Sequence, residues 1–399
     1  MRLGENIGSV YSNGREIQRV FSKGKLVWEK NRIDYNTTAF TVVALADTVV
    51  VEPHYAYKMG TDGSIDGVET IADFKYSING GEWVESHKNP ITIKKNDIVS
   101  LTGTDIFFCK IKGLSDVYGN IMSLLYGDNF VGQNVWHETP SGYARLGFFE
   151  SCDIRKAENL ILPATTLTVE CYSGMFYNCR NLTHAPKLLP ATTLTTYCYS
   201  MMFHTCTSLI APPVIAATKM GDYCCQRMFQ NCYSLTQTPD LPAKQLAHDC
   251  YSYMFLNCTS LTQTPEKLPA TTLDTGCYAF MFQNCTSLTT PPKLPASTLR
   301  QSCYTCMFQN CTSLTASPDL PANYLAYDCY SYMFKGCSNL KYVKCNGYRL
   351  AGGVNSFDEC VDGWLSGVSP TGTFVCYRIN NTNPLLEYIP STWTVEYLN

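Results

Sequence analysis

The sequence is poor in charged residues and has no long apolar run. Only 16% of its 399 residues are Asp, Glu, Lys or Arg, well below the quarter that is usual for a globular protein. The net charge is -3 and no block of Lys and Arg stands out. Nucleic acid and anionic membranes are therefore disfavoured as partners, because both bind basic surfaces. No apolar stretch reaches the length of a membrane span, so we expect no membrane insertion.

Sequence signatures of catalysis and of metal binding are also missing. The chain has no G-x-S-x-G, Walker or G-x-G-x-x-G pattern, and its six histidines are scattered without zinc spacing. A pair of catalytic carboxylates stays open, because no local spacing marks such a pair. We expect no catalytic residues, no metal and no cofactor, and a protein that is not an enzyme.

The amino-terminal sequence MRLGENIGSVYSNG lacks the apolar segment of a secretory signal peptide. We therefore expect the chain to be made in a reducing cytoplasm. In that compartment the 21 cysteines do not imply disulfide bonds.

What the sequence has instead is an internal repeat. One unit, residues 250–273, reads CYSYMFLNCTSLTQTPEKLPATTL, and Phe148-Phe149 marks a degenerate first copy. The period of 26 or 27 residues lies in the range of leucine-rich repeats. One unit buries its apolar side only by stacking on its neighbours, which predicts a solenoid. The Met-Phe pairs of the units begin at Met175, Met202, Met228, Met254, Met281, Met307 and Met333.

Each unit is expected to contain one short helix and one short strand. In C-Y-x-x-M-F-x-x-C the Met lies four residues from each Cys, which is the spacing of one helical face. The L-T-x-x-P segment that follows is too short for a helix and predicts a strand that ends at Pro. The strands of successive units would form a parallel sheet.

Stacking would place the cysteines in two ladders of small apolar side chains. On a helix, two cysteines eight residues apart are separated by roughly 12 Å, whereas a disulfide needs Cα atoms within about 7 Å. We predict buried thiols, with disulfides and metal binding as the less favoured alternatives. The C-x-x-C pattern at Cys303 and Cys306 lacks the context of a redox motif. The ladders are Cys171, Cys198, Cys224, Cys250, Cys277, Cys303 and Cys329, and Cys152, Cys179, Cys206, Cys232, Cys258, Cys285, Cys311 and Cys337.

The candidate binding residues are the first and third positions after the core leucine of each unit. Alternation along a strand would put both positions on the open face of the sheet. A solenoid commonly binds partners on such a face, and this one suits an extended polar partner, either glycan or protein. A solvated face without a ligand is the alternative. The residues are Thr183, Thr236, Thr238, Thr262, Thr264, Thr289, Thr315 and Ser317.

The regions on both sides of the repeats are expected to be rich in β structure. Residues 1–32 contain two similar segments, VYSNGREI and VFSKGKLV, whose Asn-Gly and Lys-Gly pairs indicate hairpins. Residues 33–113 predict a small β-sandwich and 114–147 a lead-in that caps the solenoid. The repeats occupy 148–343, about eight units, and 344–399 form a β-rich C-terminal cap. The predicted fold class is mainly β with short helices.

The repeats resemble the BspA-type bacterial leucine-rich repeats, in the variant CYxxMFxNCTSLTxxPxLPATTL, over about half of the chain. The segments GNIMSLLYGDNF and GVSPTGTF, and IPSTWTV near the end, are also typical of that group. Relatives occur as bacterial surface proteins and in gut bacteriophages. The stretch VYSNGREIQRVFSKGKLVW resembles the N-terminal attachment segments of phage tail-fibre and virion accessory proteins.

These resemblances imply a bacteriophage structural appendage, such as a tail fibre, located in the virion. The repeat face would bind a host cell-surface glycan or protein. Symmetric fibres are often trimers, so a homo-oligomer fits this interpretation, although no heptads predict a coiled-coil stalk. A bacterial surface adhesin-like repeat protein is the alternative, and an enzyme acting on polysaccharide is a third. The N-terminus would attach to other virion proteins through Val10, Tyr11, Val20, Phe21, Val27 and Trp28.

Overall fold

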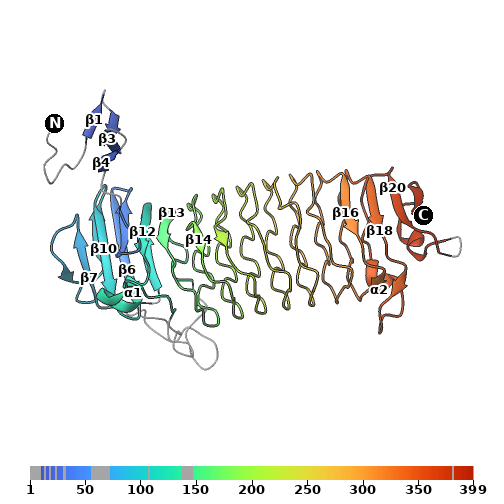
Figure 1. Ribbon diagram of the computed structural model, residues 1–399, viewed down its shortest axis with the longest axis horizontal. Helices are drawn as coiled ribbons and strands as arrows, with labels where there is room; N and C mark the ends of the chain where they lie inside the picture. The colour runs from blue at the N-terminus through green and yellow to red at the C-terminus, as the bar shows by residue number, and fades with distance from the viewer. Residues whose placement is uncertain are drawn as a thin grey trace.

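The computed structural model shows an elongated molecule, with β-sheets at both ends and stacked coils between them (Figure 1). It describes residues 33–54, 72–106, 108–136, 147–379 and 382–398. Before residue 33 it describes the backbone of four strands.

Two antiparallel hairpins form within the first 32 residues, as their Asn-Gly and Lys-Gly pairs predict. Strand β1 (Val10–Ser12) pairs with β2 (Arg15–Ile17), and β3 (Arg19–Ser22) pairs with β4 (Lys25–Glu29). The side chains predicted for attachment lie outside the described part of the structure. They are those of Val10, Tyr11, Val20, Phe21, Val27 and Trp28.

Two sheets follow, as expected for a small sandwich. The larger has the order β13-β12-β5-β10-β7-β8 and the smaller the order β11-β6-β9. Their inward side chains, among them Val42, Val49 and Val99, belong to one buried core. The bounds are β5 Phe40–Ala44, β6 Thr48–His54, β7 Phe74–Ile78, β8 Val84–Glu85, β9 Ile91–Lys94, β10 Ile98–Gly103, β11 Phe108–Lys112, β12 Ser115–Asn120 and β13 Ile154–Ile161.

The sandwich and the solenoid share one sheet. Strand β12 pairs antiparallel with β5 of the sandwich and parallel with β13, which belongs to the first repeat. The helix α1 (Ser123–Tyr126) and the 3-10 helix η1 (Gly127–Asn129) follow β12. The backbone of the first coil is therefore covered by a paired strand and is not exposed as an open edge.

The short helix predicted for each repeat is wrong. From residue 147 to 357, a range that the structure describes throughout, the chain forms no helix. In the unit at 250–258, the N–H groups of Ser252, Met254 and Leu256 donate to carbonyls three residues earlier, at 3.1, 3.2 and 3.2 Å. The intervening N–H groups donate to the following repeat instead. The segment is thus a run of tight turns.

The turn segments are also the main connection between repeats. The N–H groups of Tyr251, Tyr253 and Phe255 donate to carbonyls of the next unit at 3.0, 2.9 and 2.9 Å. Every fourth residue takes a positive φ, for example 58° at Tyr253 and 64° at Asn257. That conformation reverses the chain direction locally, so the backbone cannot continue as a right-handed helix.

The strand expected after each core leucine is shorter than predicted. In several units it is a single parallel bridge, as between Gln237 and Gln263. A two-residue pairing follows the Pro of two units, between β14 (Leu188–Leu189) and β15 (Val214–Ile215), and longer pairing occurs in the parallel sheet that ends the molecule. That sheet contains β16 (Ala316–Leu320), β18 (Tyr342–Cys345), β20 (Thr373–Tyr377) and β21 (Thr394–Leu398).

The remaining elements complete the C-terminal end. Strand β17 (Tyr324–Leu325) pairs with β19 (Arg349–Leu350), and α2 (Asp358–Val361) and the 3-10 helix η2 (Pro384–Tyr388) follow. The main-chain donors of the last turn segment bond to residues 359–366, for example Tyr330 to Cys360 at 2.9 Å. The predicted fold class, mainly β with few short helices, is confirmed.

Candidate binding surfaces on the repeats

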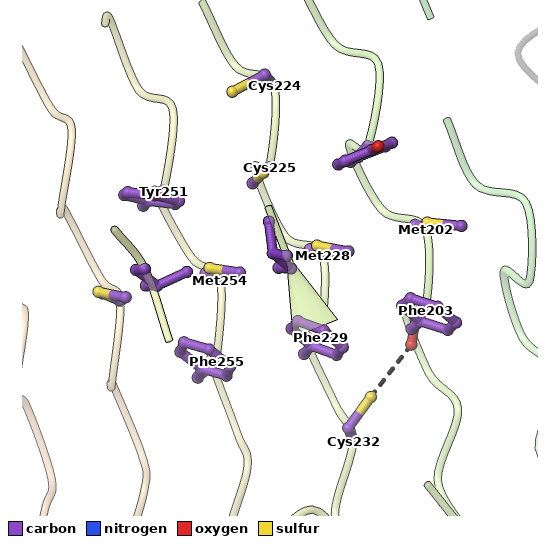
Figure 2. Close-up of a cluster of buried hydrophobic side chains, with 14 of the residues drawn as sticks. Met202, Phe203, Cys224, Cys225, Met228, Phe229, Cys232, Tyr251, Met254 and Phe255 are labelled. Carbon is purple, nitrogen blue, oxygen red and sulfur yellow. Dashed lines mark hydrogen bonds between the residues drawn. The ribbon is translucent and has the colours of Figure 1, made fainter. Parts of the chain in front are cut away.

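The cysteine ladders belong to the buried side of the turn segments, and Figure 2 shows one member of each, Cys224 and Cys232, with Met228 and Phe229 of the same unit. Cys250 and Cys258 are fully buried, and all 21 cysteines are free thiols. The thiol of Cys258 donates to the carbonyl oxygen of Phe229 in the preceding repeat at 3.1 Å. That oxygen also accepts from the N–H of Cys232 at 3.1 Å. The thiol therefore joins neighbouring units as well as filling space.

Burial also removes the nucleophilic form of these thiols. It raises the pKa of Cys258 and Cys250 above the ordinary value, and that of Cys303 to about 12. The thiolate is the reactive and metal-binding form of cysteine. Cys306 of the C-x-x-C pattern occupies the position that Phe280 holds one repeat earlier. Among the described residues, no group of three His, Cys, Asp or Glu side chains could hold a metal ion.

A ladder of asparagine side chains runs along the turn segments. Asn257, Asn284 and Asn310 have φ near 60°. The side-chain amide of each donates to the oxygen of the asparagine before it, at 2.7, 2.7 and 2.8 Å, beginning at Asn231. These amides are thus bonded within the stack and not displayed, which explains the N-C-T pattern of the repeat by its structure.

At the first position of the predicted threonine face, an exposed threonine recurs in four successive units, from Thr236 to Thr315. Thr236, Thr262 and Thr289 are exposed on successive repeats. The hydroxyls of Thr236 and Thr262 donate to the carbonyl oxygens of Ile210 and Thr236 in the preceding units, at 3.4 and 3.3 Å. Their protons are therefore used within the solenoid, whereas the oxygen lone pairs remain available to a partner that donates.

The third position of each unit is less accessible than alternation predicts. Thr238 and Thr264 are only partly exposed. Ser317 is buried, and its hydroxyl accepts from the N–H of Lys344 at 3.2 Å. Thr238 and Thr264 lie beside a single bridge, and Ser317 lies in β16 where its pairing with β18 shifts register, so the side chains do not alternate strictly. At the ends of the row, Thr183 is partly buried and Thr315 is exposed.

Sequence analysis missed the middle residue of these triplets. Gln237, Gln263 and Thr290 are exposed, although alternation would place them on the buried side. We define the threonine face as Thr236, Gln237, Thr262, Gln263, Thr289, Thr290 and Thr315. One sequence signal could have located this face. A Pro follows the first threonine of each triplet by two or three residues, and Pro limits backbone pairing because it has no N–H to donate.

A second surface, also missed, lies on the turn segments. Side chains that follow the same position from repeat to repeat stack face to face there. The ring of Tyr253 lies 4.4 Å from that of Phe280, and Tyr197 lies 4.7 Å from Tyr223. Cations join these stacks, because the Arg227 guanidinium lies 4.9 Å from the Tyr253 ring. The threonine face and this stacked surface both present groups that can bind a partner through van der Waals contact and hydrogen bonds.

The fold and these surfaces define a leucine-rich-repeat solenoid with β-structured ends. The family model for the BspA type leucine rich repeat region matches in six copies, over residues 147–262 and 249–362. These matches span more than half of the chain, so the protein belongs to the BspA-type leucine-rich repeat family. Among the described residues, no helix has the length and apolar character needed to cross a membrane.

One solved structure is similar to the chain, a leucine-rich repeat protein from Bacteroides ovatus. The two are 12% identical over 84% of this chain and 100% of that one, with a TM-score of 0.20. At that score the likeness carries no argument about this protein. No curated protein matches the chain.

Proposed function

We propose that this protein is a non-catalytic, adhesin-like binding protein of the bacterial cell surface. The threonine face would hold an extended polar partner, a host glycan or protein. One observation carries the proposal: Thr236, Thr262 and Thr289 recur at the same exposed position of successive repeats. A periodic partner could therefore make the same contact on each unit. The bonded hydroxyls of Thr236 and Thr262 can only accept, so at these two positions the partner would present N–H or O–H donors.

A phage virion protein is the competing assignment. Its support is the N-terminal sequence VYSNGREIQRVFSKGKLVW and the two hairpins formed there. In that case the hairpins would attach to other virion proteins, and a trimer would fit a fibre. The family match covers the repeats and does not include the N-terminal segment that suggests a phage protein. It therefore supports the bacterial surface protein better.

Location separates these two assignments. Antibody against residues 148–343 should label intact cells of the source bacterium if the protein is a surface adhesin. Label on purified phage particles, with none on uninfected cells, would reverse the assignment. Deleting residues 1–32 should then abolish particle incorporation without unfolding the repeats.

Binding by the threonine face can be tested with immobilised intestinal mucin, an extended glycoprotein rich in hydroxyl donors. The triple variant Thr236→Glu, Thr262→Glu and Thr289→Glu should weaken binding by about tenfold or more, because it adds charge and bulk along the face. The matched control places the same three charges on exposed threonines of another segment, at Thr218, Thr271 and Thr298. Equal binding by both variants, or none by the native chain, would contradict the proposal.

A further inference from the structure

A groove of about 510 Å³ opens on the turn segments of the first repeats. It is distinct from the threonine face, since it is lined by the Cys-to-Cys part of the units. Its volume lies within the range of sites for small molecules. Its lining includes seven residues that matter for binding: Glu150, Glu170, Gly174, Tyr177, Tyr197, Gln226 and Arg227.

The groove exists because one repeat position lacks a side chain. Gly174 occupies the place that Met201, Arg227, Tyr253 and Phe280 take in the next four units. All of these have φ between 54° and 59°, and Gly174 has φ of 59°. Glycine is therefore not needed for the backbone conformation at this place. The effect of the glycine is to leave room on the surface, because Gly174 lacks the side chain that covers this position in later repeats.

Two aromatic stacks end at the groove. The Tyr177 ring stacks on His204 at 4.8 Å, and the Tyr197 ring stacks on Tyr223 at 4.7 Å. In the preceding repeat the ladder positions of Tyr177 and Tyr197 hold Glu150 and Glu170. Both tyrosines line the groove and are only partly buried. Each is thus an aromatic platform that is supported from behind by another ring.

The polar groups of the groove are planar and hold several acceptors and donors. Glu150, Glu170, Gln226 and Arg227 line it together. Arg227 is held over the Tyr253 ring at 4.9 Å, which fixes the direction of its guanidinium. Carboxylates accept two or more hydrogen bonds each, and amide and guanidinium groups donate in fixed geometry. Such a set suits a ligand with many hydroxyls.

We infer that this groove binds a hexose unit of an uncharged oligosaccharide. A pyranose ring presents C–H groups on its faces, which favour the electron-rich face of an aromatic ring. Its hydroxyls would bond to Glu170, Gln226 and Arg227. Two glutamates and one arginine line the site, which leaves an excess of one negative charge, so uronic and sialic acids are disfavoured by like-charge repulsion. This site would act whether or not the threonine face binds.

The test is calorimetric titration of the full chain with cellohexaose, maltohexaose, mannohexaose and chitohexaose. Hexagalacturonate serves as the anionic contrast. At least one uncharged hexasaccharide should bind with a dissociation constant of about 1 mM or lower. Gly174→Met should weaken that binding by about tenfold or more, because it supplies the side chain that Met201 carries one repeat later. Tyr197→Leu should do the same by removing the platform.

The matched controls place the same residues in a repeat away from the groove. Phe280→Met occupies the position equivalent to Gly174, and Phe280→Leu removes a ring from another stack on the same surface. Both should bind like the native chain. The inference is overturned if no uncharged hexasaccharide binds with a dissociation constant of about 1 mM or lower, if hexagalacturonate binds more tightly, or if Gly174→Met and Tyr197→Leu bind like the controls. Unchanged far-ultraviolet circular dichroism of each variant establishes that it folds.

Discussion

Cys258 illustrates what the cysteines do at the scale of one residue. Its side chain is fully buried, and its thiol donates to the Phe229 carbonyl oxygen at 3.1 Å. A serine would fill less apolar space, and an alanine would lose the bond. Cysteine combines a small apolar volume with a weak donor. The residue type is therefore explained by packing and by a bond between repeats, with no need for redox or metal chemistry.

His204 gives a prediction about pH at the residue scale. Burial, with a contribution from Arg227, lowers the pKa of His204 to about 4. Between pH 6.5 and 4 the unfolded chain therefore binds a proton that the native chain does not. The free energy of unfolding should fall as the pH is lowered through that window, and it should be unaffected by this group above it.

The measurement is urea unfolding at pH 7 and pH 5. The variant His204→Gln is the matched comparison, because Gln230 holds the same position in the next repeat. This variant should lose less stability between the two pH values than the native chain does. An equal loss in both proteins would show that His204 is not responsible.

At the scale of one element, the turn segment holds residues of several types at positive φ, and its last such position is usually Asn. Such a φ costs an ordinary residue on the order of 1–2 kcal/mol, and asparagine and glycine tolerate it best. Asn257, Asn284 and Asn310 meet this need, and their amides also bond to one another. The ladder ends at Gly336, where an added Cβ would lie 2.2 Å from the Asn310 side-chain oxygen.

Two substitutions at Asn284 separate these contributions. Asn284→Ala loses the bonds to Asn257 and from Asn310 and keeps the strained φ, so it should lower the free energy of unfolding by about 2–4 kcal/mol. Asn284→Gly loses the same bonds without the strain. Chemical denaturation should therefore find Asn284→Gly about 1 kcal/mol more stable than Asn284→Ala. The reverse order would contradict the role given to the backbone.

The mistaken helix shows where sequence reasoning reaches its limit for this element. Cys250, Met254 and Cys258 are four residues apart, and over nine residues a period of four cannot be told from 3.6. Positive φ at every fourth residue is decided by contacts with neighbouring repeats, which periodicity does not contain. A local signal was present, however, in the Gly, Asp and Asn residues at Gly174, Asp249 and Asn257, since these are typical of turns.

At the scale of the whole molecule, two aromatic ladders connect the ends. Phe40 of β5 stacks on Phe149 at 5.5 Å and begins a row that reaches Phe334. The tyrosine row runs from Tyr172 to Tyr330, with Cys225 in place of one ring. Trp136 contacts its first member at 4.5 Å, and Trp364 contacts its last at 6.3 Å. Both ends of the solenoid core are thus covered by large aromatic side chains.

Removing the C-terminal cover should loosen the nearest repeats first. Trp364 is 1% exposed, and its indole N–H donates to the Tyr388 carbonyl oxygen at 2.9 Å. Trp364→Ala should lower the free energy of unfolding by about 3–5 kcal/mol. Hydrogen exchange should rise around 329–345 and stay unchanged around 171–206, because each repeat contacts only its neighbours. Trp83→Ala, at a side chain 49% exposed, is the control with little effect.

The overall architecture could be predicted from sequence better than the surfaces could. The period of the Met-Phe pairs was enough to predict the stacked units and the buried ladders. The threonine face was predicted only in part, because Thr238 is partly buried and Ser317 is buried where strict alternation would have displayed them. The groove at Gly174 could not be predicted, since it depends on which side chains the neighbouring repeats place beside a missing one.

The central claim is that the cysteines form a packed scaffold and that binding belongs to the surface. The most direct test is a thiol count on protein purified without reductant. In denaturant, all 21 cysteines should react with a thiol reagent, whereas the folded protein should show almost no fast-reacting thiols, because burial shields them from the reagent and keeps the ladder thiols Cys250, Cys258 and Cys303 protonated. A denatured count well below 21, restored by reductant or chelator, would contradict the account and return these cysteines to disulfide or metal chemistry.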